Sequence, residues 1–217
     1  MAGQRDIHDH YFREAKRAGY VARSAYKLKE IQERRRVIPR GARVLDLGAA
    51  PGAWLQVACQ AIGPRRSGGF VVGVDVKPAS VPQKFCDDRV RFVEADAFDL
   101  TPESLAQQLG VERIEFDVVL SDMMGSTSGH QATDHFQSIH LARRALEVCE
   151  SMLRRGGVFV VKVFEGELYP EFLGETRARF KSVKGFKPKA SRNESTEMYV
   201  IATGYLGPDA QRNGVDP

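Results

Sequence analysis

The chain lacks several features that would mark it as secreted, membrane-bound or metal-binding. Its 217 residues include only three cysteines, Cys59, Cys86 and Cys149, and no C-x-x-C pair. The sequence therefore predicts neither a disulfide framework nor a zinc site, and the cysteines in helix-like patterns are expected to be small core residues. There is no apolar run of about 18 residues, so no membrane span is expected. The first residues, Met-Ala-Gly-Gln-Arg-Asp, contain no apolar stretch like that of a signal peptide. Together these absences favour the reducing cytoplasm.

Positive charge is concentrated in two segments of the chain. Residues 1–43 contain 12 Lys/Arg and 5 Asp/Glu, and residues 177–192 contain 7 Lys/Arg and no acid. The stretch 44–176 between them is acidic, with 12 basic and 19 acidic residues. Such clustering either forms a solvated face or binds a polyanion, and the second interpretation needs support from other features.

Beyond the break at Pro39-Arg40-Gly41, apolar strand-like runs alternate with helical patterns. Strands are predicted at 43–47, 70–74, 90–94, 116–121, 158–163, 182–186 and 198–203. Helices are predicted at 6–36, 53–62, 102–110, 133–155 and 170–180, with Gly156-Gly157 ending the long helix. This order predicts a Rossmann-like α/β fold with a seven-stranded, mostly parallel sheet and helices on both faces. Ligands of such sheets bind where the strands end.

Three parts of the chain are expected. Residues 1–40 would form a basic helical extension packed on the catalytic domain, residues 41–205 would form that domain, and residues 206–217 a disordered tail. The length suits one α/β domain with short extensions.

The segment D-L-G-A-A-P-G-A-W at 46–54 directly follows the first strand. Its small residues, which let a ligand approach the backbone, are Gly48, Ala49, Ala50 and Gly52. The helix that follows presents free N–H groups to an anion. The G-x-x-x-G spacing differs from the dinucleotide fingerprint, and Asp46 suits a cationic amine better than a pyrophosphate. A ligand with both an amine and a carboxylate is favoured, such as the methionine part of S-adenosylmethionine.

Acidic residues also follow the second and third strands. A carboxylate at Asp75 can hold the two ribose hydroxyls of a nucleoside, and Asp96 can accept a hydrogen bond from the adenine amine. Acids at strand ends also cap turns, so neither residue identifies a site alone. Together with the glycine-rich turn, they predict a nucleoside cofactor.

The combined motifs resemble those of the FtsJ/RrmJ family of RNA ribose methyltransferases. The matching segments are R-S-A-Y-K-L at 23–28, D-L-G-A-A-P-G-A-W at 46–54, V-L-S-D-M at 119–123, V-V-K-V-F at 160–164 and S-T-E-M-Y-V-I-A at 195–202. The resemblance covers roughly residues 8–205. It implies the S-adenosylmethionine-dependent methyltransferase fold, no metal, and a cofactor site formed by Asp46, Gly48, Ala49, Ala50, Pro51, Gly52, Trp54, Asp75, Asp96 and Asp122.

The resemblance also implies a catalytic tetrad at Lys27, Asp122, Lys162 and Glu197. Three members have support from the sequence pattern. Asp122 ends the fourth strand, and Lys162 lies in an apolar strand where an unpaired lysine is costly. Glu197 begins the last strand, and it reaches the same sheet edge if that strand runs antiparallel. Lys27 also fits an ordinary surface lysine.

Methyl transfer from a sulfonium is an in-line displacement, in which the enzyme aligns the nucleophile and helps to remove its proton. We expect Lys162 to be the base and Asp122 to orient it. Lys27 would be a neighbouring cation, and Glu197 would position Lys27 or the ribose.

The sequence departs from the bacterial family pattern after Asp122. It reads Met-Met-Gly-Ser-Thr-Ser-Gly-His without the usual proline, so Gly125 and Gly129 are candidate hinges in a loop at 123–129.

Compact members of the family methylate a uridine ribose of large-subunit ribosomal RNA in the assembled subunit, and the same substrate is expected here. The basic segments would hold RNA phosphates, while Tyr11, Phe12 and Tyr20 either stack on bases or pack on the domain. A monomer that binds neither DNA nor membranes is expected. The alternatives are a transfer RNA ribose methyltransferase, a catalytically inactive ribosome assembly factor, a small-molecule methyltransferase, or a mitochondrial counterpart of the ribosomal enzyme.

Overall fold

The computed structural model describes residues 2–125, 128–191 and 196–208. The helices are α1 (Ala2–Ala18), α2 (Ala25–Arg35), α3 (Ala53–Ile62), α4 (Pro102–Leu109), α5 (Gln131–Met152) and α6 (Tyr169–Arg177), with a short 3₁₀ turn η1 (Arg65–Ser67). The strands are β1 (Arg43–Leu47), β2 (Phe70–Asp75), β3 (Val90–Glu94), β4 (Phe116–Ser121), β5 (Leu153–Phe164), β6 (Phe180–Phe186) and β7 (Glu197–Tyr205).

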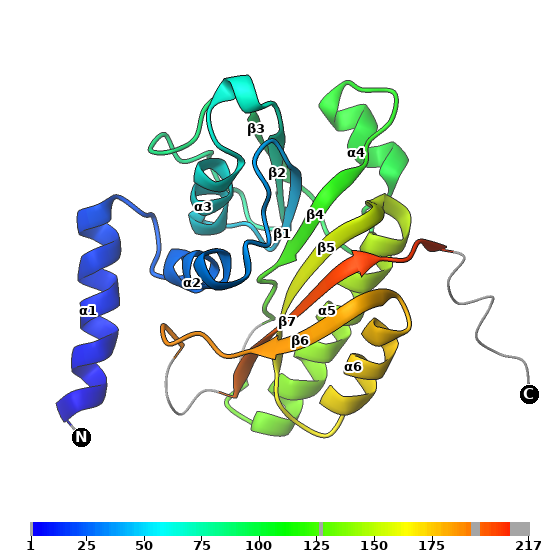
Figure 1. The fold of residues 1–217 in the computed structure, drawn as a ribbon. Helices are drawn as coiled ribbons and strands as arrows, with labels where there is room; N and C mark the ends of the chain where they lie inside the picture. The colour runs from blue at the N-terminus through cyan, green and yellow to red at the C-terminus, as the bar shows by residue number, and fades with distance from the viewer. Residues whose placement is uncertain (1, 126–127, 192–195, 209–217) are drawn as a thin grey trace, which may run out of the picture.

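The strands form a single seven-stranded sheet in the order β3-β2-β1-β4-β5-β7-β6 (Figure 1). The pairs among β1 to β5 are parallel, whereas β7 runs antiparallel to both β5 and β6. The predicted mostly parallel sheet is confirmed. The strand order reverses between β1 and β4, which is where such sheets bind their ligands.

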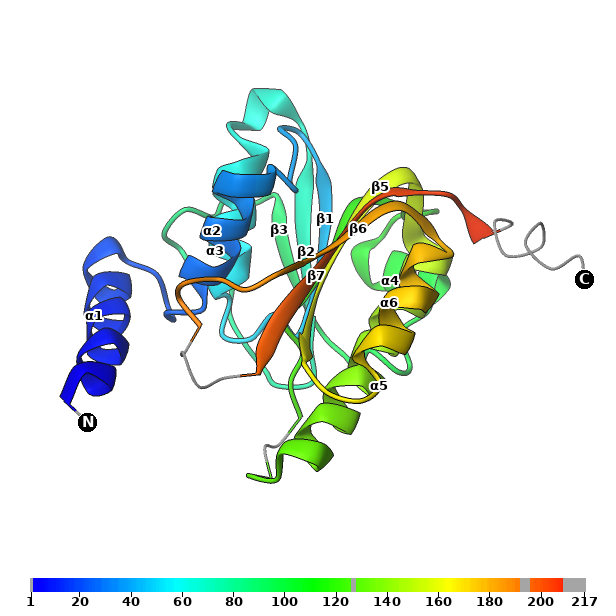
Figure 2. The same ribbon diagram turned by 60° about the horizontal axis from the view of Figure 1, so that its bottom comes forward.

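Helices cover both faces of the sheet, as predicted. Figure 2 shows α2 and α3 on one side and α4, α5 and α6 on the other. Each layer encloses a core of its own, one around Leu45, Phe116 and Phe159 and the other around Leu28 and Leu55. Because both sheet faces are buried, the central strands are mostly apolar, and this is why they could be recognised in the sequence.

Several predicted helix boundaries were wrong. The predicted helix 170–180 ends at Arg177, and Phe180 begins β6. The long helix ends at Met152 rather than at residue 155, because Leu153 is buried and starts β5. Gly156, with φ of +80°, lies inside an irregular start of that strand, where the register with β4 shifts. The predicted helix 6–36 is broken by a turn at residues 19–24, which Gly19 opens with φ of +84°.

The first helix stands beside the body of the molecule, with α2 between it and the sheet (Figure 1). Its second half attaches through buried Ala15 and through Tyr11, whose ring centroid lies 5.5 Å from that of Tyr26. No helix in the described residues has the length and apolar character needed to cross a membrane. Of the predicted tail, residues 209–217 lie outside the described part.

Candidate active site

A glycine-rich turn joins the end of β1 to the start of α3. Gly48 has φ of +76° and Gly52 has φ of +103°, values that residues with a Cβ rarely adopt. A Cβ at Gly48 would lie 2.7 Å from the Cα of Met123. The peptide bond between Ala50 and Pro51 is cis. The turn therefore needs glycine at both positions, and its backbone passes directly against the loop that follows β4.

Asp46 is the most unusual residue of the turn region. Its side chain is fully buried in β1, and both carboxylate oxygens lack a hydrogen-bond partner among the described residues. Burial, and then the neighbouring carboxylates of Asp122 and Asp75, raise the pKa of Asp46 well above its usual value. A buried, unpaired carboxylate is costly unless a cation or a donor reaches it. The position therefore suits a ligand that brings a positive charge.

A hollow of about 250 Å³ lies next to the turn. It is lined by Gly48, Asp75, Asp96, Phe98 and Met123, among others. The Asp75 carboxylate accepts hydrogen bonds from the backbone N–H groups of Ala50 (2.9 Å) and Lys77 (2.8 Å). Asp96 accepts one from the N–H of Phe98 at 2.9 Å. Both acids thus hold their loops in place, and each carboxylate keeps further acceptor capacity.

The other predicted cofactor residues do not line this hollow: Asp46, Ala49, Ala50, Pro51, Gly52, Trp54 and Asp122. Trp54 is buried, and its indole N–H donates to the carbonyl oxygen of Ser24 at 3.0 Å. Its ring centroid lies 5.6 Å from that of Tyr199. Trp54 therefore contacts both the segment before α2, through Ser24, and strand β7, through Tyr199.

Lys162 and Asp122 form one ion pair at the carboxyl ends of β4 and β5. The Lys162 Nζ donates to the backbone oxygen of Asp122 at 2.7 Å and lies 3.1 Å from its Oδ1. The lysine side chain is only 4% exposed, so the ion pair supplies the partner that a buried ammonium needs. The same Oδ1 accepts a hydrogen bond from the Tyr199 hydroxyl at 2.9 Å.

Lys27 and Glu197 form a second ion pair. The Lys27 Nζ lies 2.6 Å from Glu197 Oε2, and Glu197 Oε1 accepts a hydrogen bond from the Ser191 hydroxyl at 2.7 Å. Lys27 comes from α2, so this N-terminal helix contributes directly to the site. Its side chain is 13% exposed, which is not what an ordinary surface lysine would show.

The sheet register explains how residues so far apart in sequence meet. In the antiparallel pairing of β5 with β7, Phe164 stands opposite Glu197 and Lys162 opposite Tyr199. The antiparallel direction, which the sequence left as a condition, therefore brings the start of β7 to the edge where the parallel strands end. Burial, and then the carboxylates of Asp122 and Glu197, raise the pKa of Tyr199, so its hydroxyl remains a proton donor between the two ion pairs.

Sequence reasoning missed Tyr199 and Ser191. Tyr199 could have been found, because it stands two residues after Glu197 on a strand and so faces the same side. Ser191 lies in a loop without periodicity, and nothing in the sequence marked it.

In the predicted mobile loop at 123–129, residues 126 and 127 lie outside the described part. Gly129 has φ of +81°, while a Cβ at Gly125 would lie 2.5 Å from the Gln137 side chain.

The two basic segments lie against each other beside Lys27. The backbone N–H of Lys189 donates to Glu30 Oε2 of α2 at 2.7 Å. The Arg34 guanidinium of the same helix lies 6.0 Å from the ring centroid of Phe186. Of the three candidate stacking residues, Tyr20 is buried and its hydroxyl donates to Gln60 at 2.7 Å, whereas Phe12 is 58% exposed.

The chain is similar to curated proteins named as methyltransferases. A curated relative from Methanothrix thermoacetophila, named ribosomal RNA large subunit methyltransferase E, is 45% identical over 202 residues, covering 93% of this chain and 74% of the relative. A protein of the same name from Syntrophobacter fumaroxidans is 48% identical, covering 90% of this chain and 94% of the relative.

A crystal structure from Plasmodium falciparum, described as that of a ribosomal RNA methyltransferase, superposes with a TM-score of 0.74 at 23% identity, covering 87% of this chain and 100% of that one. At this identity the likeness concerns the fold alone. The sequence profile of FtsJ-like methyltransferases matches residues 20–205, which is most of the chain. The protein belongs to the FtsJ-like methyltransferase family.

Proposed function

We propose that the protein methylates the 2′-hydroxyl of a ribose in large-subunit ribosomal RNA, at a uridine of the assembled subunit, with S-adenosylmethionine as methyl donor. Family membership and the names of the relatives support the reaction and the RNA class. The observation that carries the proposal is the pair of buried ion pairs, Lys162 with Asp122 and Lys27 with Glu197, at the sheet edge next to the glycine-rich turn.

The residues around the turn fit this cofactor. Asp46 offers an unpaired buried carboxylate to its amino group, and Gly48 and Gly52 allow close approach of the backbone. We assign Asp75 to the ribose hydroxyls and Asp96 to the adenine amine, because both line the hollow beside the turn. When bound, S-adenosylmethionine supplies an activated methyl group.

The chain's own residues then have two tasks. Lys162 enters the reaction as the neutral amine and takes the proton that leaves the ribose hydroxyl, and Asp122 fixes the position of the amine and pairs with the ammonium that forms. Lys27 adds a positive charge that favours loss of the proton from the ribose hydroxyl. Glu197 holds Lys27 in place. Tyr199 and Ser191 orient the two carboxylates as positioning residues.

The adjoining basic segments form the surface next to Lys27 on which RNA phosphates bind. Phe12 is exposed and available for stacking on a base. In this proposal residues 1–40 are an RNA-binding extension of a catalytic domain at 41–205. The protein acts as a cytoplasmic monomer, and the requirement for a 2′-hydroxyl excludes DNA.

The test is transfer of labelled methyl to purified hypomethylated large subunits, with free ribosomal RNA and transfer RNA assayed in parallel. Label at one ribose of the subunit is expected, with much less on either free RNA. Label on transfer RNA alone would redirect the proposal to that substrate. Cofactor binding without label on any RNA would favour an inactive assembly factor.

A further inference from the structure

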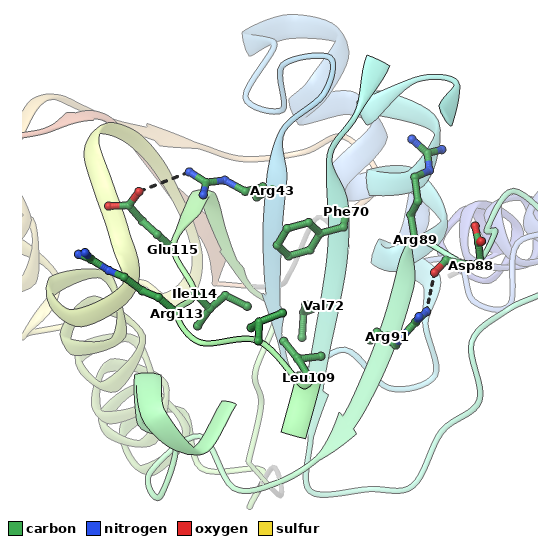
Figure 3. Close-up of a pocket in the computed structure, with 11 residues that line it drawn as sticks. Arg43, Phe70, Val72, Asp88, Arg89, Arg91, Leu109, Arg113, Ile114 and Glu115 are labelled. Carbon is green, nitrogen blue, oxygen red and sulfur yellow. Dashed lines mark hydrogen bonds and ion pairs between the residues drawn. The ribbon is translucent and has the colours of Figure 1, made fainter. Parts of the chain in front are cut away.

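A second hollow lies at the edge of the sheet where the parallel strands begin, and Figure 3 shows the residues that line it. It has a volume of about 260 Å³ and an apolar floor that includes Phe70, Val72 and Ile114. Phe70 begins β2, whereas Asp122 and Lys162 lie where β4 and β5 end. With strands of five or six residues, the two edges are roughly 15–20 Å apart. The hollow is therefore separate from the proposed cofactor and catalytic site.

Four arginines and two acids border this hollow: Arg43, Arg89, Arg91, Arg113, Asp88 and Glu115. Arg43 pairs with Glu115 across it. Arg91 donates to the backbone carbonyl oxygens of Asp88 and Val90. The exposed Arg113 has no hydrogen bond or ion pair to any residue that the structure describes. Arg91 and Arg113 can therefore bind an external anion without breaking an ion pair seen here.

The positive charge extends along the whole edge. The segments that precede or begin the parallel strands, 40–43, 65–68, 87–91, 111–117 and 154–155, contain nine arginines, five acids and no lysine. They come from five separated parts of the chain, so counts along the sequence do not reveal this surface. Arginine binds phosphate oxygens with a planar pair of donors and also stacks on bases, which a lysine does not do.

We propose that this hollow is a second RNA-binding site, which takes one unpaired base of ribosomal RNA against Phe70 and its phosphates on Arg91 and Arg113. The inference rests on the proposed function, because an assembled subunit presents RNA to more than one side of a bound enzyme. Proteins recognise unpaired bases by stacking on aromatic rings.

The test compares the full-length protein with the variants Arg91→Gln/Arg113→Gln and Phe70→Leu in binding to hypomethylated large subunits over a range of salt. The double variant should bind roughly tenfold more weakly at physiological salt, and its salt slope should fall by about 0.9 for each phosphate that the variant no longer neutralises. Phe70→Leu should weaken binding about fivefold or more while leaving the salt slope nearly unchanged. S-adenosylmethionine binding, measured in the same preparations, should stay at the wild-type level and shows that the variants are folded.

Arg143→Gln is the matched control, because this arginine is already paired with Glu171 and Glu175 on the helical layer. It should leave both affinity and salt slope unchanged. A photoreactive benzoylphenylalanine at Val111, which lines the hollow and is 47% exposed, should cross-link to RNA.

Wild-type affinity and salt slope in the double variant would overturn the second site, as would cross-links to ribosomal protein alone. Absence of methyl transfer by the wild-type protein would instead be a failure of the proposed function. Transfer by the wild type together with unchanged binding by the variants would reject only the second site.

Discussion

At the scale of single residues, Asp46 combines a stability cost with a binding role. Its buried carboxylate has no partner among the described residues, so Asp46→Asn should stabilise the cofactor-free protein by about 1 kcal/mol, since burying a neutral amide costs less than burying a charge. The same change should weaken S-adenosylmethionine binding by tenfold or more. Thermal melting and cofactor titration measure the two effects. Asp96→Asn, at an exposed acid with a backbone hydrogen bond, is the control and should not stabilise. Destabilisation by Asp46→Asn would contradict this account.

The raised pKa of Asp46 also predicts a pH dependence. The folded state holds the proton of Asp46 to higher pH than the unfolded state does. The contribution of Asp46 to the stability of the cofactor-free protein should therefore fall as pH rises from the usual aspartate range through the raised pKa. Asp46→Asn removes this contribution, so the difference in melting temperature between variant and wild type should grow with pH. A difference that is constant from pH 4 to pH 8 would show that Asp46 does not titrate as described.

Tyr199 can be tested in the same way as a positioning residue. Tyr199→Phe removes the hydroxyl that donates to Asp122, and single-turnover methyl transfer should slow by roughly 10- to 100-fold, as for loss of other supporting hydrogen bonds in active sites. Cofactor affinity should change little. Tyr205→Phe is a matched control, because the buried Tyr205 hydroxyl has no hydrogen-bond partner within the described residues. A full rate in Tyr199→Phe would remove Tyr199 from the mechanism.

At the scale of elements, the N-terminal helices differ in what they contribute. Helix α2 buries Leu28 and Ile31 and carries Lys27, whereas among residues 10–18 of α1 only Ala15 is buried. Deletion of residues 2–18 should therefore leave the melting transition and cofactor binding nearly intact. Binding to large subunits should weaken at least several-fold, since basic residues of α1 are removed. A deletion variant that fails to fold, or one that binds subunits normally, would contradict this division.

The elements also show how far the sequence could lead. The central strands were predictable because burial on both faces makes them mostly apolar, whereas the antiparallel direction of the last strand was only a condition for bringing Glu197 to the edge where the parallel strands end. The end of α5 was misplaced, because Leu153 continues the apolar pattern of the helix while its backbone already belongs to β5. Local patterns cannot resolve such a boundary, because tertiary packing decides it. Ser191 was missed for a related reason, since its role depends on a contact across the fold.

At the scale of the whole molecule, charge placement predicts a salt dependence. The segments 1–43 and 177–192 meet beside Lys27, and an enzyme that neutralises several phosphates should bind subunits much more weakly as salt rises from about 50 to 200 mM. Cofactor binding should change little over that range. Activity measured at several salt concentrations with saturating cofactor checks this expectation. Insensitivity to salt would favour a small-molecule substrate instead.

Charge counted along the sequence also fails to show where the arginines gather on the folded protein. Residues 44–176 are acidic when counted along the chain, yet seven of their nine arginines gather at the amino edge of the sheet, at 65–66, 89, 91, 113 and 154–155. Only the parallel topology brings these segments together. The predicted tetrad, by contrast, was inferred from motifs that resemble a known family, and the fold places its four members in two largely buried ion pairs.

The central claim is that Lys162 removes the proton from a ribose hydroxyl of ribosomal RNA. Its most direct test is single-turnover methyl transfer to hypomethylated large subunits by the wild type and Lys162→Ala, with cofactor and subunits saturating and cofactor affinity measured on the same preparations. If Lys162 is the base, the wild type should place label at one ribose, and this label should be resistant to alkaline cleavage. The variant should transfer methyl at a rate at least about 100-fold lower, with cofactor still bound. Near-normal transfer by Lys162→Ala would contradict it.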